Sequence, residues 1–401
     1  MENKILIDSG FDTDFDVKQI NEINNIFNYE NNLKNYIDSL HKDSLSYDLK
    51  RGEYYPEILR ATKTLKNIIS LKYNIDSSQV HPNFGSNGSI DTILTSLLSE
   101  QMIQVQLIMN NKDFLADEKI FHIDNILNQT KALAITPTYF RNYNSTRSKN
   151  IQLEKVAIEN NDFNFDIDMI IDKIKNTTSK LIMLVTPNNP TGIALKKQDL
   201  YKMLDTIQND QWCMIDRTLV DIDDNIDTKE ILYKYKNKNI VVLHSFSKFN
   251  SLSHIRIGVA LYSNSNFANN IQPNLPLGAN FEGLIKASKL ILEKNIIKAD
   301  ENIVNNIKKN KEHLIDFFNN YNEIKITNFV SNYALVYWKK NNFNSLELEK
   351  YLKRYSLFVM DGSEFPESNK YVIRLHTGAD HKLILKFSNV LQKFLKQKGI
   401  N

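Results

Sequence analysis

The sequence predicts an α/β protein whose main sheet is mostly parallel, because helix-length segments alternate with short apolar runs from about residue 60 to 260. Each run has four or five residues and is apolar on both faces, as in a strand buried inside a sheet. In such sheets, ligands bind at the carboxyl ends of the strands. The predicted strands are 132–135, 181–185, 212–215, 240–243 and 257–261.

The C-terminal third predicts a second, smaller α+β unit. Residues 330–337 and 371–375 are typical of strands, and residues 380–396 are typical of an amphipathic helix. The apolar face of that helix consists of Leu383, Phe387, Val390, Leu391, Phe394 and Leu395. We therefore expect two domains with no Pro/Gly/Ser linker between them. Their bounds are 51–284 for the large domain, and 285–401 together with 1–50 for the small one.

Composition narrows the classes of function. The chain has 401 residues and a formal net charge of +3, which argues against a dedicated nucleic-acid or polybasic membrane role. Its single cysteine, Cys213, excludes an internal disulfide. The closest pair of histidines, His376 and His381, has no acidic or cysteine residues at the spacing of metal ligands, so we expect no metal. Residues 1–16 lack the basic start and apolar run of a signal peptide, and no stretch is apolar enough to span a membrane. We expect a cytoplasmic protein.

Polar motifs follow three of the predicted strands. Strand 181–185 is followed by residues 186–192 (TPNNPTG), a rigid turn in which Asn189 presents a side-chain amide at one point. Strand 212–215 is followed by Asp216, a carboxylate that needs a partner where it is buried. The plainer alternatives are a simple tight loop for the turn, and an ion pair or a helix N-cap for the aspartate.

The third motif contains a lysine. After strand 240–243, the residues HSFSK place Lys248 at the mouth of the strand, with Ser245 close by. Arg256 follows eight positions further on. Two cations and a hydroxyl group are suited to anion recognition. On its own, such a lysine would usually be a solvated surface residue.

In this order, the turn PNNPTG, a strand that ends in aspartate, and the residues SFSK and RIG resemble the class I/II aminotransferases of pyridoxal-5′-phosphate (PLP) fold type I. The similarity is greatest to the histidinol-phosphate aminotransferase-like branch. It extends from about residue 55 to the C-terminus, and the spacings of 27 residues from Asn189 to Asp216 and 32 from Asp216 to Lys248 suit that family.

The resemblance implies a role for each matching residue. Lys248 resembles the lysine that holds the cofactor as a Schiff base and carries the proton at the substrate α-carbon. Asp216 resembles the partner of the pyridine nitrogen, and Asn189 resembles the donor to the 3′-oxygen. Tyr139, in residues 137–143 (PTYFRNY), resembles the aromatic residue that stacks on the ring. An ordinary aromatic at a strand end is the alternative for Tyr139.

The resemblance also implies a phosphate site. Residues 84–91 (FGSNGSID) lead into a predicted helix, and free amides at a helix start bind anions. Gly88 and Ser89 would bind the phosphate there together with Ser245 and Arg256. A Gly-Ser turn before a helix is common, however, and on its own carries little weight.

Two further matches concern the subunit interface and the substrate. Tyr55 matches the tyrosine that reaches the phosphate of the neighbouring subunit, which implies a homodimer with active sites at the interface. Arg374 matches the arginine that binds the α-carboxylate of the amino acid with a bidentate fork. Without that context, Arg374 would be a surface residue at a strand end.

One residue departs from the family pattern. Leu219 stands where the family usually has a tyrosine that shares the 3′-oxygen with the asparagine. We expect an aminotransferase that moves an α-amino group between an L-amino acid and a 2-oxo acid. Leu219 favours the alternative, a PLP-dependent lyase, decarboxylase, cyclase or oxidase acting on amino acids. A non-catalytic binding or regulatory module is disfavoured, because Lys248 is retained and no helix-turn-helix extension is present.

Overall fold

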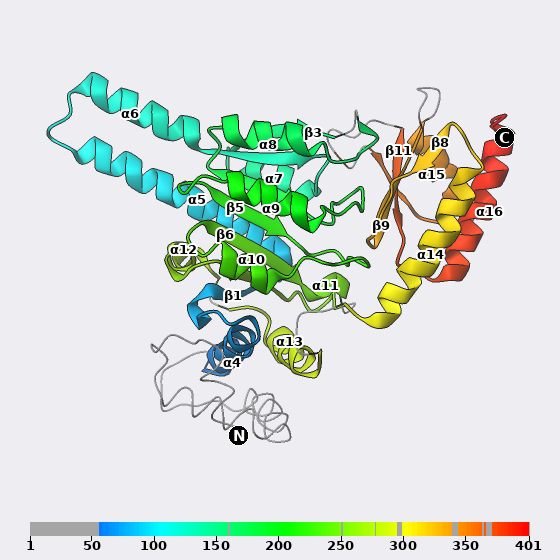
Figure 1. Ribbon diagram of the computed structural model, residues 1–401, viewed down its shortest axis with the longest axis horizontal. Helices are drawn as coiled ribbons and strands as arrows, with labels where there is room; N and C mark the ends of the chain where they lie inside the picture. Colours follow the sequence, from blue (N-terminus) through cyan, green and yellow to red (C-terminus); the bar gives the residue numbers. More distant parts are fainter. Residues whose placement is uncertain are drawn as a thin grey trace.

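Two sheets form the framework of the protein. The computed structural model describes residues 56–400 except 159–160, 250–251, 277, 295–298, 339–343, 363–364 and 366–370. Within the described residues, one sheet has seven strands and the other has four. Figure 1 shows the larger sheet in the middle of the molecule and the smaller sheet beside it, near the C-terminus.

The seven-stranded sheet has the order β1-β7-β6-β5-β4-β2-β3. Neighbouring strands from β3 to β6 are parallel, and β7 runs antiparallel to both β6 and β1. All five predicted strands belong to this sheet, so the predicted α/β class is confirmed. The strands are β1 (Val80–Asn83), β2 (Lys131–Thr136), β3 (Gln152–Ala157), β4 (Leu181–Val185), β5 (Trp212–Asp216), β6 (Asn239–Ser245) and β7 (Gly258–Tyr262).

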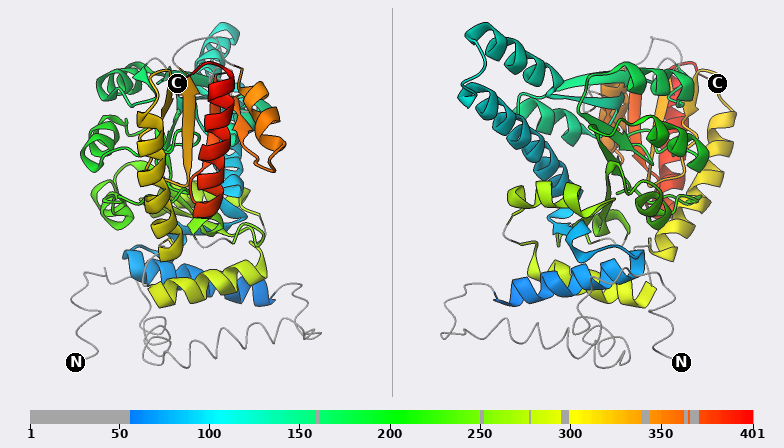
Figure 2. Two further views of the ribbon diagram at one scale, coloured as in Figure 1. Left: turned by 90° about the vertical axis from the view of Figure 1, so that its right-hand side faces the viewer. Right: turned by 60° about the vertical axis from the view of Figure 1, so that its left-hand side comes forward.

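Helices cover both faces of this sheet because successive strand residues point to opposite sides. In β5, Trp212 and Met214 pack in the core that includes α5, whereas Cys213 and Ile215 pack in the core that includes α9 and α10. Figure 2 shows α4 and α13 side by side along one edge of the molecule. The helices that accompany the larger sheet are α4 (Pro56–Tyr73), α5 (Gly85–Asn110), α7 (Phe140–Ser148), α8 (Ile167–Asn176), α9 (Lys197–Thr206), α10 (Thr228–Lys234), α11 (Phe246–Phe249), α12 (Ser265–Ile271) and α13 (Phe281–Lys294), with the 3-10 turns η1 (Ser77–Gln79) and η3 (Gln272–Asn274).

Helix α5 begins within the predicted segment 84–91, continues to Asn110 and forms an arm with α6 (Ala116–Gln129). Figure 1 shows this two-helix arm projecting away from the smaller sheet. A helix of 26 residues is about 40 Å long, so the arm lies far from the first turn of α5. The large apolar side chains exposed on the arm are Met102, Ile103, Leu107, Met109, Leu115, Ile120, Phe121 and Leu127.

The four-stranded sheet is antiparallel, with the order β10-β11-β9-β8. Figure 2 shows α14 and α16 side by side against it. The predicted C-terminal helix is confirmed as α16, but Leu383 was wrongly placed on its buried face: that side chain is 49% exposed, and Ile384 is buried instead. The elements are β8 (Ile324–Ile326), β9 (Tyr333–Trp338), β10 (Met360–Asp361), β11 (Val372–His376), α14 (Glu301–Asn319), α15 (Ser345–Lys353) and α16 (His381–Gln397). Among all helices of the described residues, none combines the length and apolar character needed to cross a bilayer.

Candidate active site

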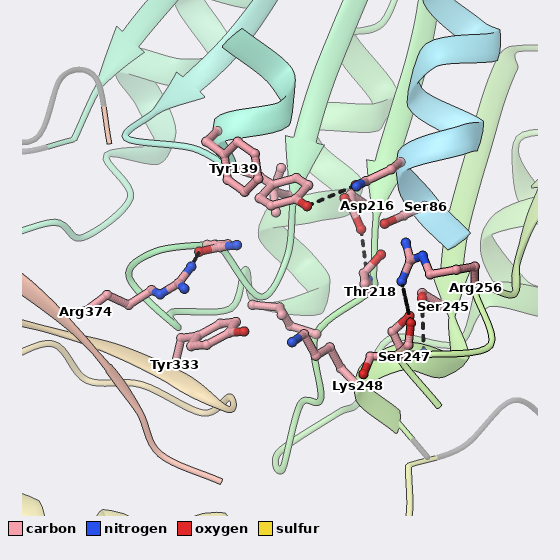
Figure 3. Close-up of a pocket in the computed structure, with 16 residues that line it drawn as sticks. Ser86, Tyr139, Asp216, Thr218, Ser245, Ser247, Lys248, Arg256, Tyr333 and Arg374 are labelled. Atoms are coloured by element: carbon pink, nitrogen blue, oxygen red, sulfur yellow. Dashed lines mark hydrogen bonds between the residues drawn. The ribbon is translucent and has the colours of Figure 1, made fainter. Parts of the chain in front are cut away.

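A cavity of about 430 Å³ lies at the carboxyl ends of β4, β5 and β6, where β9 and β11 contribute residues from the smaller sheet. Figure 3 shows the side chains that line it. Seven of the predicted site residues are brought together there, although they span more than two hundred positions of the chain. They are Tyr139, Asn189, Asp216, Ser245, Lys248, Arg256 and Arg374.

Lys248 reaches the cavity from α11, a single helical turn that begins directly after β6. The turn is anchored by Phe246, whose side chain is buried and whose carbonyl accepts a hydrogen bond from Leu252 N at 3.3 Å. Ser245 Oγ accepts a second bond, from Ser247 N at 3.2 Å. The Lys248 Nζ lies 5.5 Å from the centre of the Tyr333 ring, so the amine is held inside the cavity.

Asp216 is the last residue of β5 and is almost fully buried, with 3% of its surface exposed. Its Oδ1 accepts a hydrogen bond from Thr218 N at 2.9 Å. Burial raises the pKa of this carboxyl, and the bond from Thr218 lowers it in part. In the described part of the chain, Asp216 forms no ion pair and caps no helix. A buried carboxylate without a cation is costly, so Asp216 fits a site for a positively charged ligand atom.

Asn189 belongs to the turn after β4. Arg374, on β11, donates a hydrogen bond from Nη1 to Asn189 Oδ1 at 2.9 Å. The preceding Asn188 is fixed as well, since its Nδ2 donates to Pro137 O at 3.2 Å. Because the amide oxygen of Asn189 is already engaged, its NH₂ group is what the turn offers to the cavity.

Tyr139 lies at the entrance to α7, and its hydroxyl donates to Asn87 Oδ1 at 3.0 Å. Burial raises the pKa of this phenol. Helix α7 is tied to α5 because Arg141 forms an ion pair with Asp91, and Lys149 contacts the same carboxylate at 3.3 Å. These contacts hold the Tyr139 ring against the cavity, as stacking on a flat ligand requires.

The first turn of α5 closes the other end of the cavity through Ser86 and Asn87. Its N-cap residue, Phe84, gives no side-chain hydrogen bond, so the amides of this turn are available to an anion. Arg256 lies beside them: its Nη1 donates to Ser247 Oγ at 3.2 Å and to Ser253 O at 3.0 Å. These groups are suited to binding a phosphate.

Not every predicted site residue lines the cavity. Gly88 and Ser89 lie one step further along α5 and are absent from the lining; a Cβ at Gly88 would come within 2.4 Å of Asn83 Oδ1. The Ser89 hydroxyl is buried and has no hydrogen-bond partner among the described residues. Their role in phosphate binding stays a prediction. Tyr55 lies outside the described residues.

Several lining residues were not predicted: Ser86, Asn87, Phe140, Thr218, Ser253 and Tyr333. Phe140, Thr218 and Asn87 are direct neighbours of predicted site residues or motifs, so proximity in sequence could have indicated them. Tyr333 offered no such signal. It enters the site because β9 pairs with β11, which places Tyr333 opposite His376 and two residues from the level of Arg374.

Three features lie at one edge of a mostly parallel sheet: a buried carboxylate, a lysine after the next strand, and a helix N-terminus with uncapped amides. Together they are typical of a PLP enzyme of fold type I. The family model for aminotransferase class I and II matches residues 116–385, about two thirds of the chain. The chain therefore belongs to the class I and II aminotransferase family, and its cofactor is pyridoxal 5′-phosphate.

Similar proteins agree with this assignment. Over 225 residues the chain is 26% identical to the histidinol-phosphate aminotransferase of Sulfurimonas denitrificans, covering 55% of this chain and 52% of that protein. The chain thus spans about half the length of the curated relatives it matches. Its fold resembles the crystal structure of the histidinol-phosphate aminotransferase from Clostridium acetobutylicum (TM-score 0.69, 18% identity, 90% and 94% coverage). It also resembles L-threonine-O-3-phosphate decarboxylase from Porphyromonas gingivalis (TM-score 0.64, 17% identity, 90% and 95% coverage).

The residues present fit this cofactor on three independent counts. Asp216 is a buried carboxylate with no ion-pair partner among the residues that the structure describes, and the cofactor has a ring nitrogen that can be protonated. The start of α5 presents uncapped amides, with Arg256 nearby, to a phosphate. The cavity, of about 430 Å³, also has room for a small aromatic ring, and both Tyr139 and Lys248 line it.

Proposed function

We propose that this enzyme is an aminotransferase that moves an α-amino group between an L-amino acid and a 2-oxo acid in two half-reactions. The observation that carries the proposal is the convergence of the Lys248 amine, the Asp216 carboxylate and the Arg374 guanidinium on one cavity. The family, and the similarity to histidinol-phosphate aminotransferases over about half the chain, support the same reaction class.

When bound, PLP supplies a ring that accepts electrons from the substrate α-carbon. In this proposal Lys248 holds the cofactor covalently and then, released as a free amine, removes and returns the proton at that carbon. Asp216 holds the ring nitrogen in its protonated form, because opposite charges in contact favour both ionised states. Arg374 binds the substrate carboxylate and so aims the α-carbon at Lys248.

The remaining lining residues would hold the cofactor in place. The Asn189 amide would donate to the ring oxygen, and the Tyr139 ring would stack on the ring face. The phosphate would be bound by Ser245, Arg256 and the first turn of α5. Gly88 and Ser89 would contribute to the same phosphate site from within that turn.

We also propose a cytoplasmic homodimer. Tyr55 supports the dimer, because its family counterpart reaches the phosphate in the neighbouring subunit. Active sites would then lie at the interface. Size-exclusion chromatography with light scattering would test the dimer, and mixing a Tyr55→Phe chain with a Lys248→Ala chain would test whether sites are shared.

Leu219 favours a second candidate, an amino-acid lyase, decarboxylase, cyclase or oxidase that uses the same cofactor. Its side chain lines the cavity where the family usually has a tyrosine, and a hydrocarbon cannot donate a hydrogen bond. The bonds that hold cofactor and substrate would be the same in either case, so only the fate of the substrate differs.

One experiment separates the two candidates. The purified holoenzyme is mixed with a panel of L-amino acids and no 2-oxo acid. An aminotransferase releases one equivalent of 2-oxo acid per active site and then stops, since no amino acceptor is present. Repeated turnover that releases carbon dioxide, ammonia or hydrogen peroxide would contradict the aminotransferase and favour the second candidate.

A further inference from the structure

Tyr333 lies between two groups that the proposed function uses. The centre of its ring is 4.1 Å from the guanidinium carbon of Arg374 and 5.5 Å from Lys248 Nζ. The side chain is buried, with 7% of its surface exposed, and it lines the cavity. Figure 3 shows the Tyr333 hydroxyl directed into the cavity toward Lys248. The residue therefore presents a ring face to one cation and a phenol to the reacting amine.

Two loops of the larger sheet fix Tyr333 in this position. Gly192 has φ of +71°, and a Cβ there would come within 1.8 Å of the Tyr333 carbonyl oxygen, so the turn after β4 packs directly on the Tyr333 backbone. The neighbouring Asn332 accepts a hydrogen bond from Val220 N at 3.2 Å through its Oδ1. Since Val220 follows Leu219, this bond fastens the loop that carries Leu219 to the start of β9.

Leu219 and Tyr333 therefore face one cavity from adjoining backbone segments. Leu219 is buried and offers only hydrocarbon, whereas Tyr333 offers a hydroxyl that can donate. We propose that Tyr333 is a catalytic residue: its hydroxyl donates a hydrogen bond to the anionic ring oxygen of the bound cofactor beside Lys248, which Leu219 cannot do, while its ring supports Arg374. This inference rests on the part of the proposed function in which Lys248 holds the cofactor, and it is independent of the reaction that follows.

The roles of the Tyr333 hydroxyl and of its ring can be tested with separate variants. Tyr333→Phe removes only the donor, so the absorbance of the holoenzyme should titrate at a pH about one to two units higher, as expected for one lost hydrogen bond to a charged oxygen. The ring under Arg374 remains in this variant, so its contact with the guanidinium group is kept. Tyr333→Leu removes the ring as well and should weaken amino-acid binding by a further factor of about two to thirty.

The chain offers a matched control on the same strand. Tyr337 lies on the same face of β9, but it does not line the cavity. Its ring packs against the ring of Phe163, with 5.3 Å between the two ring centres. Tyr337→Phe removes an equivalent hydroxyl and should leave the titration of the holoenzyme unchanged. A rescue completes the set: in the Tyr333→Phe background, Leu219→Tyr should bring the titration midpoint back down by restoring a phenol to the cavity.

The decisive experiment is a pH titration of holoenzyme absorbance for the wild type, Tyr333→Phe and Tyr337→Phe, with Lys248 labelling by borohydride verified in each. We expect an upward shift in Tyr333→Phe alone. A midpoint in Tyr333→Phe equal to that of the wild type, with Lys248 still labelled, would overturn the role of Tyr333 and leave the cofactor assignment intact. A wild type that shows no label on Lys248 would overturn the proposed function itself, and this inference with it. The titration midpoint can be measured without knowing the substrate of the enzyme.

Discussion

Arg374 donates a 2.9 Å hydrogen bond to Asn189 and thereby joins the smaller sheet to the turn after β4. The bond engages the amide oxygen, so the amide nitrogen is the group presented to the cavity. Arg374 also lies over the Tyr333 ring. The residue proposed to bind substrate is thus in direct contact with two residues proposed to bind the cofactor.

Substitution of Arg374 should mainly weaken amino-acid binding. Arg374→Ala should cost about 2–5 kcal/mol of binding free energy if the ion pair is desolvated. Arg374→Lys should recover only part of this, because an ammonium group lacks the planar fork that matches a carboxylate. The measurement is the dissociation constant of an amino acid for each variant. The control is the dissociation constant of the matching amine, which lacks the carboxylate. Unchanged affinity of Arg374→Ala for the amino acid would show that the carboxylate binds elsewhere.

Neutralising Asp216 should slow the chemical step and partly preserve cofactor binding. Asp216→Asn keeps the shape of the side chain but no longer holds the ring nitrogen protonated, so the single-turnover rate should fall by about 10²–10³-fold. Asp221→Asn is the matched control: burial raises the pKa of that carboxyl to about 6, yet Asp221 does not line the cavity. Equal rates for Asp216→Asn and the wild type would remove Asp216 from the mechanism.

The stability of the protein should depend on pH through His244. This side chain is buried in β6 beside Thr228, with Nε2 3.0 Å from Oγ1, and burial together with the Arg217 charge lowers its pKa from 6.5 to about 3. In the unfolded chain, His244 is therefore protonated as the pH falls through 6.5, whereas in the folded chain it is protonated only near pH 3. The free energy of unfolding therefore decreases as the pH falls from 6.5 to 3.

The expected contribution of His244 between pH 7 and pH 5 is about 2 kcal/mol. Other groups act in the opposite direction; the raised pKa of Asp221, for example, favours the folded state as the pH falls. The comparison that isolates His244 is urea unfolding of the wild type and His244→Gln at both pH values. The loss on acidification should be smaller in the variant by about that amount, and an identical loss would show that His244 protonates freely in the folded protein.

The sequence predicted the five central strands of the larger sheet and missed its two edge strands, β1 and β3. The central strands read as continuous apolar runs because helices cover them on both sides. β3, at the edge of the sheet, has the sequence QLEKVA and only one fully buried residue, Val156, so it has no such run. The two-helix arm was missed for a different reason: the large apolar residues of its outer surface are exposed, so they do not form the buried face by which a helix is recognised in a sequence.

The site was predictable where its residues follow strands of the larger sheet. Asp216 is the last residue of β5, whereas Asn189 and Lys248 come shortly after β4 and β6. Because these neighbouring strands are parallel, their carboxyl ends lie at one edge of the sheet and bring the three residues together. Tyr333 could not be found in this way, since its place depends on the pairing of β9 with β11 and on contacts of Gly192 and Asn332. The domain boundary near residue 284 stays a prediction.

The proposed mechanism depends on covalent attachment of the cofactor to Lys248, and chemical labelling detects that bond. The holoenzyme is reduced with borohydride, digested and mapped by mass spectrometry, with Lys248→Ala as the control that should bind PLP without covalent attachment. We expect a single pyridoxyl group on Lys248 and none in the control. A pyridoxyl group on any other lysine of the native enzyme, with Lys248 unlabelled, would show that Lys248 is not the residue that holds the cofactor.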